Sequence, residues 1–189
     1  MIINDSYHSI SSHLKKLLEK NYQSVIINNR FNSNKISDLT KDVKSNKTLW
    51  DNNETFFIKK ELRESDYLII NIGIFELNDF YNAFDMDNNY ILFKKLYQNL
   101  EELLVEIKKY TKDTIIFLGY YNPTDYYDSK TDKFFYNVDL KLNRLMMDND
   151  IIYISTYELV KGNKYKDNNY LLNKEGALRI AETLYFYIN

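Results

Sequence analysis

The chain has 189 residues, which is enough for one domain with a proper core and too few for two domains of ordinary size. Its 25 Lys and Arg against 27 Asp and Glu leave a formal net charge of −2, which argues against a nucleic-acid-binding protein and a polybasic membrane-surface protein. The sequence has no cysteine and two histidines, His8 and His13, so disulfides, cysteine nucleophiles and a histidine-rich metal cage are excluded, and we expect neither a metal nor another cofactor.

Short β-branched or aromatic runs alternate with amphipathic helical patterns along the whole chain. In chain order we predict a strand at 1–3, a helix at 9–20, a strand at 23–27, a helix at 54–62, a strand at 67–72, a helix at 89–110, a strand at 114–118, a helix at 134–147, a strand at 151–154 and a helix at 174–187. The last four strand runs are apolar on successive residues, as in parallel strands that are covered on both faces. The pattern predicts a single α/β domain over residues 1–189, a flavodoxin-like three-layer α/β/α sandwich around a five-stranded parallel sheet.

The sequence shows no feature of a membrane protein or of an exported one. No apolar run approaches the ~18 residues that a membrane-spanning helix needs. The N-terminus lacks the basic region and the extended apolar region of a signal peptide. We therefore predict a cytoplasmic protein. If an N-terminal segment had been removed from the chain, the remaining sequence would look the same.

In doubly wound sheets, ligands bind beyond the carboxyl ends of the strands, where the strand order reverses. Three segments are therefore expected to frame a site, at residues 4–8, 73–79 and 119–127. In the first of them, Asp5 and Ser6 follow the first predicted strand and precede a helix. Two interpretations remain open, because either residue can simply cap the helix, whereas Ser6 can also be a nucleophile beside backbone N–H groups that stabilise an oxyanion.

The other two segments supply candidate binding residues. Gly73 is explained by a tight exit from its strand, and Glu76 by a solvated position in a loop, unless both line the site. The loop that contains Tyr121 and Asn122 brings four tyrosines to the expected cleft. Aromatic faces beside Asn and Asp suit a sugar or another flat polar ligand, and the alternative is that these rings pack the loop onto the fold.

The order and spacing of these segments resemble the SGNH or GDSL hydrolases, a family of flavodoxin-like esterases, lipases and carbohydrate deacetylases. Residues 4–6, Asn-Asp-Ser, resemble the Gly-Asp-Ser block of the family, which implies that Ser6 is the nucleophile. Residues 73–76, Gly-Ile-Phe-Glu, stand where the family has Gly-x-Asn-Asp. Residues 172–176 are similar to the segment just after the catalytic Asp-x-x-His, so the resemblance covers essentially the whole chain and implies an ester hydrolase.

The segment near the C-terminus departs from the family pattern. Aligned without gaps, the histidine position of the family falls on Leu171 and its aspartate position on Asn168. One inserted residue moves these positions to Tyr170 and Asp167, which restores the acid and not the imidazole. Neither alignment supplies a histidine.

The expected oxyanion hole departs from the pattern as well. The oxyanion asparagine of the family maps to Phe75, whose side chain donates no hydrogen bond. The glycine of the second block falls near Ser33 or Asn34, and asparagine tolerates the left-handed geometry that such a glycine often has. The glycine before the nucleophile is replaced by Asn4.

The size of these losses decides which function we predict. Removing the general base of a serine hydrolase costs roughly 10⁶-fold in turnover, and removing one oxyanion donor costs about 10²–10³-fold. We therefore predict an SGNH-hydrolase-like protein with a degenerate site that is a non-catalytic or weakly active binding or accessory module. Its ligand would be a small molecule or a carbohydrate, and a protein partner also remains open.

The alternative is an active serine esterase for O-acyl or O-acetyl groups of a carbohydrate or a lipid. In that case Ser6 would use an unconventional base such as His8, Glu76, Asp167 or Tyr170. A flavodoxin or a phospho-acceptor receiver fits poorly. The first loop lacks a phosphate cradle, and neither the expected aspartate nor the expected lysine ends its strand.

Overall fold

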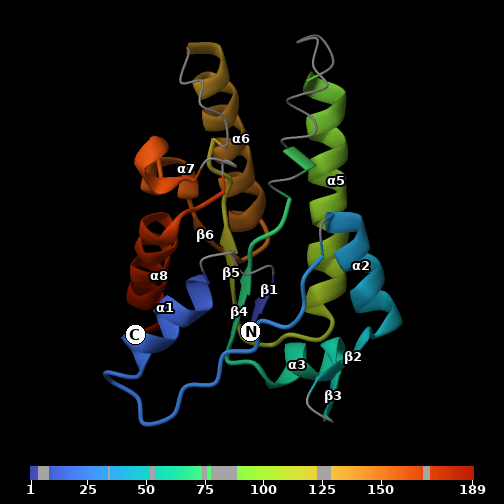
Figure 1. Ribbon diagram of the computed structural model, residues 1–189. Helices are drawn as coiled ribbons and strands as arrows, with labels where there is room; N and C mark the ends of the chain where they lie inside the picture. The colour runs from blue at the N-terminus through green and yellow to red at the C-terminus, as the bar shows by residue number, and fades with distance from the viewer. Residues whose placement is uncertain are drawn as a thin grey trace.

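Figure 1 shows the computed structural model of the chain, which describes residues 1–3, 9–33, 35–51, 54–73, 76–77, 89–122, 129–167 and 171–189. Within these residues a parallel sheet has the strand order β1-β4-β5-β6. Its strands are β1 (Ile2–Ile3), β4 (Tyr67–Ile70), β5 (Thr114–Leu118) and β6 (Ile152–Ile154). The parallel direction brings the carboxyl ends of all four strands to one edge of the sheet, at the top of Figure 1.

Helices cover both faces of this sheet (Figure 1). The helices on the first face are α2 (Ile36–Ser45), α3 (Ile58–Glu64), α5 (Asn89–Lys108) and α6 (Ser129–Met147), and those on the second face are α1 (Ile10–Leu18) and α8 (Lys174–Ile188). Successive side chains of β5 alternate between the two apolar cores, with Phe117 in the first core and Ile116 and Leu118 in the second. This alternation explains why the strand is apolar on successive residues.

The long predicted helix is confirmed as α5. Its leucine and isoleucine positions recur every three or four residues, and Leu96, Leu100, Leu104 and Ile107 are completely buried. On the opposite side of the same helix, Val105 is 60% exposed. The helix therefore packs one apolar stripe against the sheet, as its sequence period predicts.

The predicted strand at 23–27 is wrong, and the described residues form a four-stranded sheet. One backbone hydrogen bond between described residues, from the Ile2 N–H to the Asn28 carbonyl (2.8 Å), joins this segment to β1. The side chain of Ile26 is 90% exposed, so this apolar run is not covered on both faces. An apolar run of five residues cannot by itself distinguish a buried strand from a coil that packs only some of its side chains.

The helix predicted at 54–62 is half wrong. Residues Glu54–Phe57 form β3, which pairs in antiparallel fashion with β2 (Thr48–Asp51), and α3 begins only at Ile58. Phe56 packs against the first core whereas Phe57 is 39% exposed, which is the alternation of a strand.

Four elements were not predicted from the sequence: α2, β2, the single turn α7 (Thr156–Leu159) and the 3₁₀ turn η2 (Asn163–Tyr165). The remaining predicted helices and strands are confirmed with shifted ends, the largest shift being the earlier start of α6 at Ser129. In the part of the chain that the structure describes, no helix has the length and apolar character to cross a membrane.

The buried stripe of α5 gives a test of the packing. We expect Leu100→Ala to lower the free energy of unfolding by about 2–5 kcal/mol, because it leaves a cavity at a completely buried position. On the same helix, the exposed Val105→Ala should change it by less than about 0.5 kcal/mol. Urea denaturation followed by circular dichroism measures both variants, and equal effects would contradict the helix orientation.

Candidate functional site

The carboxyl ends of the strands form the edge at which a site is expected. Beyond β4 the chain continues through Gly73 to Glu76, and beyond β5 through Gly119 to Asn122. Of the predicted site residues, the structure places seven: Ser33, Gly73, Glu76, Tyr121, Asn122, Asp167 and Leu171. The other eight lie outside the described residues: Asn4, Asp5, Ser6, His8, Asn34, Phe75, Asn168 and Tyr170.

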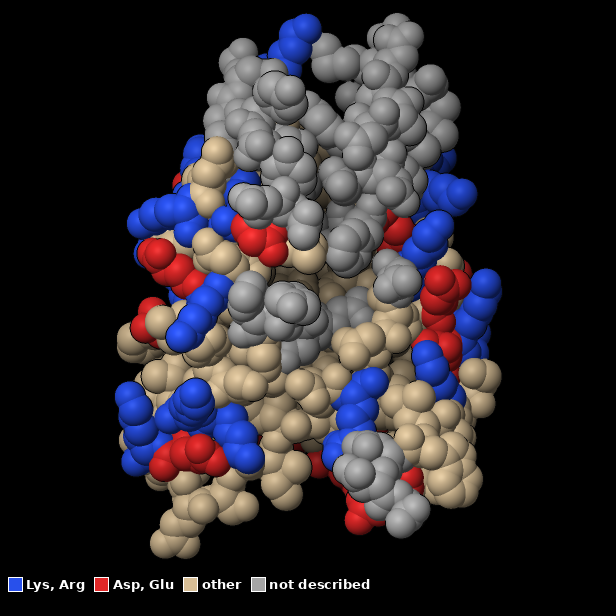
Figure 2. Space-filling view, viewed as in Figure 1, with Lys and Arg blue, Asp and Glu red and all other residues tan. Residues whose placement is uncertain are grey.

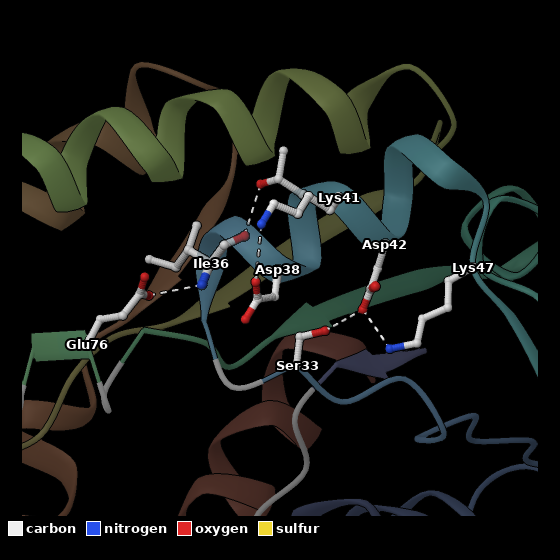
Figure 3. A network of polar contacts seen from close by, with 8 residues as sticks. Ser33, Ile36, Asp38, Lys41, Asp42, Lys47 and Glu76 are labelled. Carbon is white, nitrogen blue, oxygen red and sulfur yellow. Dashed lines mark hydrogen bonds and ion pairs between the residues drawn. The ribbon is translucent and has the colours of Figure 1, made fainter.

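Glu76 is buried instead of solvated. Its side chain is 7% exposed, and Oε2 accepts a hydrogen bond from the backbone N–H of Ile36 at 3.0 Å (Figure 3). Ile36 is the first residue of α2, so the carboxylate satisfies an N–H group at the positive end of that helix. Glu76 therefore holds α2 against the edge of the sheet.

Ser33 fastens the chain that leads into α2. Its hydroxyl donates to Oδ2 of Asp42 at 2.7 Å, and the same oxygen accepts from Nζ of Lys47 at 2.7 Å (Figure 3). The Ser33 side chain is thus engaged with α2 through Asp42.

Gly73 is required by a close contact with a tyrosine that the sequence analysis did not single out. It has φ 103°, and a Cβ atom placed on it would lie 2.1 Å from the hydroxyl of Tyr120. That hydroxyl is buried and has no hydrogen-bond partner among the described residues. Burial, with a smaller contribution from Glu76, raises the pKa of Tyr120 well above its usual value, so the group stays a protonated donor.

Tyr121 and Asn122 are buried at 8% and 4% exposure. Burial raises the pKa of Tyr121, and the carboxylate of Asp167 adds to the effect. The backbone carbonyl of Asn122 accepts a hydrogen bond from Nζ of Lys166 at 2.6 Å. At these two positions the chain after β5 is packed down onto the fold, so the Tyr121 ring has little free face for a ligand to stack on.

Asp167 and Leu171 close a loop just before α8. The Leu171 N–H donates to Oδ1 of Asp167 at 3.1 Å, and the Asp167 N–H donates to the Leu171 carbonyl at 2.9 Å. Lys166 and Leu172 pair across the base of the loop, and Asn173 caps the helix by accepting from the Gly176 N–H. The Asp167 carboxylate thus stabilises its own loop.

A buried carboxylate on α6 is a second feature that the sequence analysis missed. Asp139 accepts hydrogen bonds from the hydroxyls of Tyr153 (2.6 Å) and Ser155 (2.9 Å) at the carboxyl end of β6. Burial raises the pKa of Asp139, and the two hydroxyl donors only partly oppose this effect. The sequence did contain a signal for this burial. Asp139 follows Val138 and lies on the side of α6 that also buries Phe135 and Leu142.

The chemistry of the described part of this edge is therefore hydrogen bonding by buried hydroxyls, amides and carboxylates. Among the residues that the structure describes, no group of three or more His, Asp or Glu side chains could hold a metal ion.

Comparison with known proteins gives structural matches only. No family model and no curated protein matches the sequence. In structure the chain is similar to Axe2, an acetylxylan esterase from Geobacillus stearothermophilus, at 15% identity and TM-score 0.71, over 95% of this chain and 80% of that one. A catalytic mutant of the same esterase matches at 15% identity and TM-score 0.73, over 100% of this chain and 92% of that one.

A lipase, Lip_vut3 from a goat rumen metagenome, matches at 16% identity and TM-score 0.77, over 97% of this chain and 93% of that one. These similarities confirm the predicted three-layer α/β/α fold and, at the level of the fold, the resemblance to the SGNH hydrolases. The chain has an esterase-like fold.

The buried Asp139 predicts a particular dependence of stability on pH. Because folding raises the pKa of this carboxyl, the stability that it contributes is full below the unfolded value of about 3.9 and is lost as the pH rises through the folded value. We expect the unfolding free energy of the wild type, minus that of Asp139→Asn, to fall as the pH rises above about 4.

Chemical denaturation at several pH values measures this difference. The exposed Asp148→Asn is the matched control, and its profile should run parallel to that of the wild type. A difference for Asp139→Asn that rises with pH would contradict the assignment.

Proposed function

We propose that this chain binds a small polar ligand, of the acylated-carbohydrate class, at the carboxyl ends of its strands, and hydrolyses esters weakly or not at all. The observation that carries the proposal lies in the segment before α8, where the SGNH resemblance calls for an acid and a histidine. The sequence has no histidine after His13, and the Asp167 carboxylate accepts the Leu171 N–H within a closed loop.

The chemical argument concerns the base. A serine hydroxyl is a weak nucleophile at neutral pH unless a neighbouring base removes its proton. Loss of that base costs roughly 10⁶-fold in turnover, which is enough to make an esterase inactive in ordinary assays. A carboxylate is a poor substitute for the imidazole, because an ordinary aspartate is a far weaker base than histidine. Oδ1 of Asp167, moreover, already accepts the Leu171 N–H.

The choice of ligand class rests on the fold and on the named activities of the proteins that share it. Two similar structures are described as an acetylxylan esterase and a lipase. The edge of the sheet in this chain carries hydroxyl and amide groups, including the Tyr120 hydroxyl, which has no described partner. Such groups suit the hydroxyls of a sugar better than an acyl chain alone.

We also propose that residues 1–189 form one domain.

The first experiment measures catalysis. We expect the purified wild type to react with a fluorophosphonate probe, and to hydrolyse p-nitrophenyl acetate, no faster than Ser6→Ala does. Ser45→Ala, at the exposed end of α2, is the matched control for a serine substitution. Circular dichroism establishes that all three proteins are folded.

Labelling and turnover that disappear in Ser6→Ala and persist in Ser45→Ala would overturn the degenerate-site proposal. The alternative function, an active serine esterase, would then hold. His8→Ala and Asp167→Asn would identify which group supplies the unconventional base.

The second experiment measures binding together with turnover. Acetylated xylo-oligosaccharides are titrated into the protein by calorimetry, and free acetate is followed by proton NMR in the same samples. We expect heat of binding without release of acetate. Release of acetate contradicts the proposed loss of catalysis, and absence of binding contradicts the proposed ligand class.

A further inference from the structure

A cavity of about 600 Å³ lies at the opposite end of the sheet from the candidate site. It is half open to solvent and is lined by β1, the start of β4, the coil at 22–28 and residues of α1, α3 and α8. About half of the lining residues have aliphatic side chains, among them Ile2, Leu14, Leu18, Val25, Ile27 and Ile69. Its volume lies within the range of cavities that hold small organic molecules.

The cavity lies beneath the coil at 22–28. Side chains fix this coil at both of its ends, but among the described residues only its end at Asn28 forms a backbone hydrogen bond with β1. At one end the side-chain amide of Asn21 donates to the Tyr185 hydroxyl at 2.7 Å. At the other end Asn28 accepts the Ile2 N–H through its carbonyl and donates from Nδ2 to Glu61 at 2.5 Å. Between these anchors the coil runs beside β1 without forming the expected fifth strand.

The charged side chains that line the cavity are all acidic: Glu61, Glu64 and Asp66. Glu61 is engaged with Asn28, and Glu64 makes a long ion pair with Lys60 at 3.9 Å on the exposed surface. The Asp66 carboxylate has neither a hydrogen bond nor an ion pair to any residue that the structure describes. No Lys or Arg is among the described residues that line the cavity.

The amino group of Met1 also lies at the cavity, where it donates to the Tyr67 carbonyl at 2.7 Å. Burial lowers its pKa to about 6, although Glu61 and Asp66 act in the opposite direction. At pH 7.5 this amine is therefore mostly uncharged, and the acidic side chains decide the charge of the cavity.

Figure 2 shows how charged side chains are distributed over the face seen in Figure 1. Blue and red side chains are interspersed along the left and right of the face. Below the grey atoms, the middle of the face is mostly tan, whereas nearer the lower edge tan surface lies between a group of blue and red side chains on the left and blue and red side chains on the right. The aliphatic lining of the cavity together with the Asp66 carboxylate at its rim is complementary to a cation with an apolar body.

We propose that this cavity binds a small organic cation with an apolar body, such as an alkylammonium compound. The apolar body occupies the space between the coil and β1, against Val25, Ile27 and Ile69. The ammonium group lies at the acidic rim beside Asp66. The aromatic rings of Tyr22 and Tyr67, which also line the cavity, provide faces that attract a cation.

The test uses three probes that share a six-carbon chain and differ in head-group charge: hexyltrimethylammonium, 1-hexanol and hexanoate. Binding is measured by calorimetry at pH 7.5, and the site by shifts of the labelled isoleucine methyl groups, where Ile2, Ile27 and Ile69 should respond. We expect the cation to bind about fivefold to tenfold more tightly than hexanoate, with 1-hexanol between them.

Variants separate the charge of the site from its volume. Asp66→Asn should weaken binding of the cation about threefold to fivefold and leave 1-hexanol unchanged, since it removes one carboxylate without changing shape. The exposed Asp148→Asn, on the turn after α6, should change neither. Ile27→Trp should weaken all three probes by filling the cavity, and Val25→Phe serves the same purpose if Ile27→Trp fails to fold.

Three results would overturn the proposal: equal affinity for the three probes, tighter binding of hexanoate, or methyl shifts away from the cavity. A concentration-dependent dimer that Ile26→Ser dissolves would show instead that a second copy of the chain covers this opening. Because Ser6→Ala leaves this cavity intact, the outcome is independent of the result for the proposed function.

Discussion

The carboxyl edge of the sheet depends on two contacts in which a tyrosine hydroxyl occupies the place of a glycine side chain. The Tyr120 hydroxyl lies against Gly73, and the Tyr153 hydroxyl lies against Gly119, each where a Cβ atom would be closer than 2.3 Å. These contacts let two large polar rings enter the interior directly behind the strand ends. A buried hydroxyl needs a partner. Tyr153 has one in Asp139, whereas Tyr120 has none among the described residues. The same kind of contact therefore gives one hydroxyl a carboxylate partner and leaves the other buried without a described one.

The polar groups around these contacts mostly serve the fold. Glu76 satisfies the start of α2, Asp139 joins α6 to β6, and Asp167 closes the loop before α8. Each carboxylate accepts hydrogen bonds that hold an element of the fold in place. An esterase needs the reverse arrangement, with an imidazole oriented by a carboxylate and kept available to the nucleophile. This conflict between holding the scaffold and serving the reaction supports the proposal of a binding protein built on an esterase-like fold.

The sequence predicted the alternation of strands and helices because α/β sheets leave strong periodic signals, and β5 and α5 appear where those signals are clearest. It failed at 23–27, where an apolar run is compatible with either a strand or a coil and only tertiary contacts decide. It missed α2, although Ile36, Leu39 and Val43 have helical spacing. The burial of Glu76 and Tyr120 could not be predicted, because each depends on contacts with residues far away in the chain, whereas the buried side of α6 gave a signal for Asp139 that the sequence analysis did not use. The absence of a histidine after His13 could be read directly from the sequence, because it does not depend on the three-dimensional structure.

The missing fifth strand has consequences at the other end of the molecule. A strand on the free edge of β1 would fill the space beside Ile2 and pair its backbone, whereas the coil makes one such bond and leaves a cavity. The residues that fix the coil are asparagines that bond to α8 and to Glu61 on α3, so the opening is held by side chains from both layers of helices. Because both ends of the coil are already fixed, the coil loses less conformational entropy when a ligand binds than an untethered coil would lose. The departure from the regular sheet is therefore the feature that gives this chain a second place to bind, separated from the strand ends by the length of the sheet.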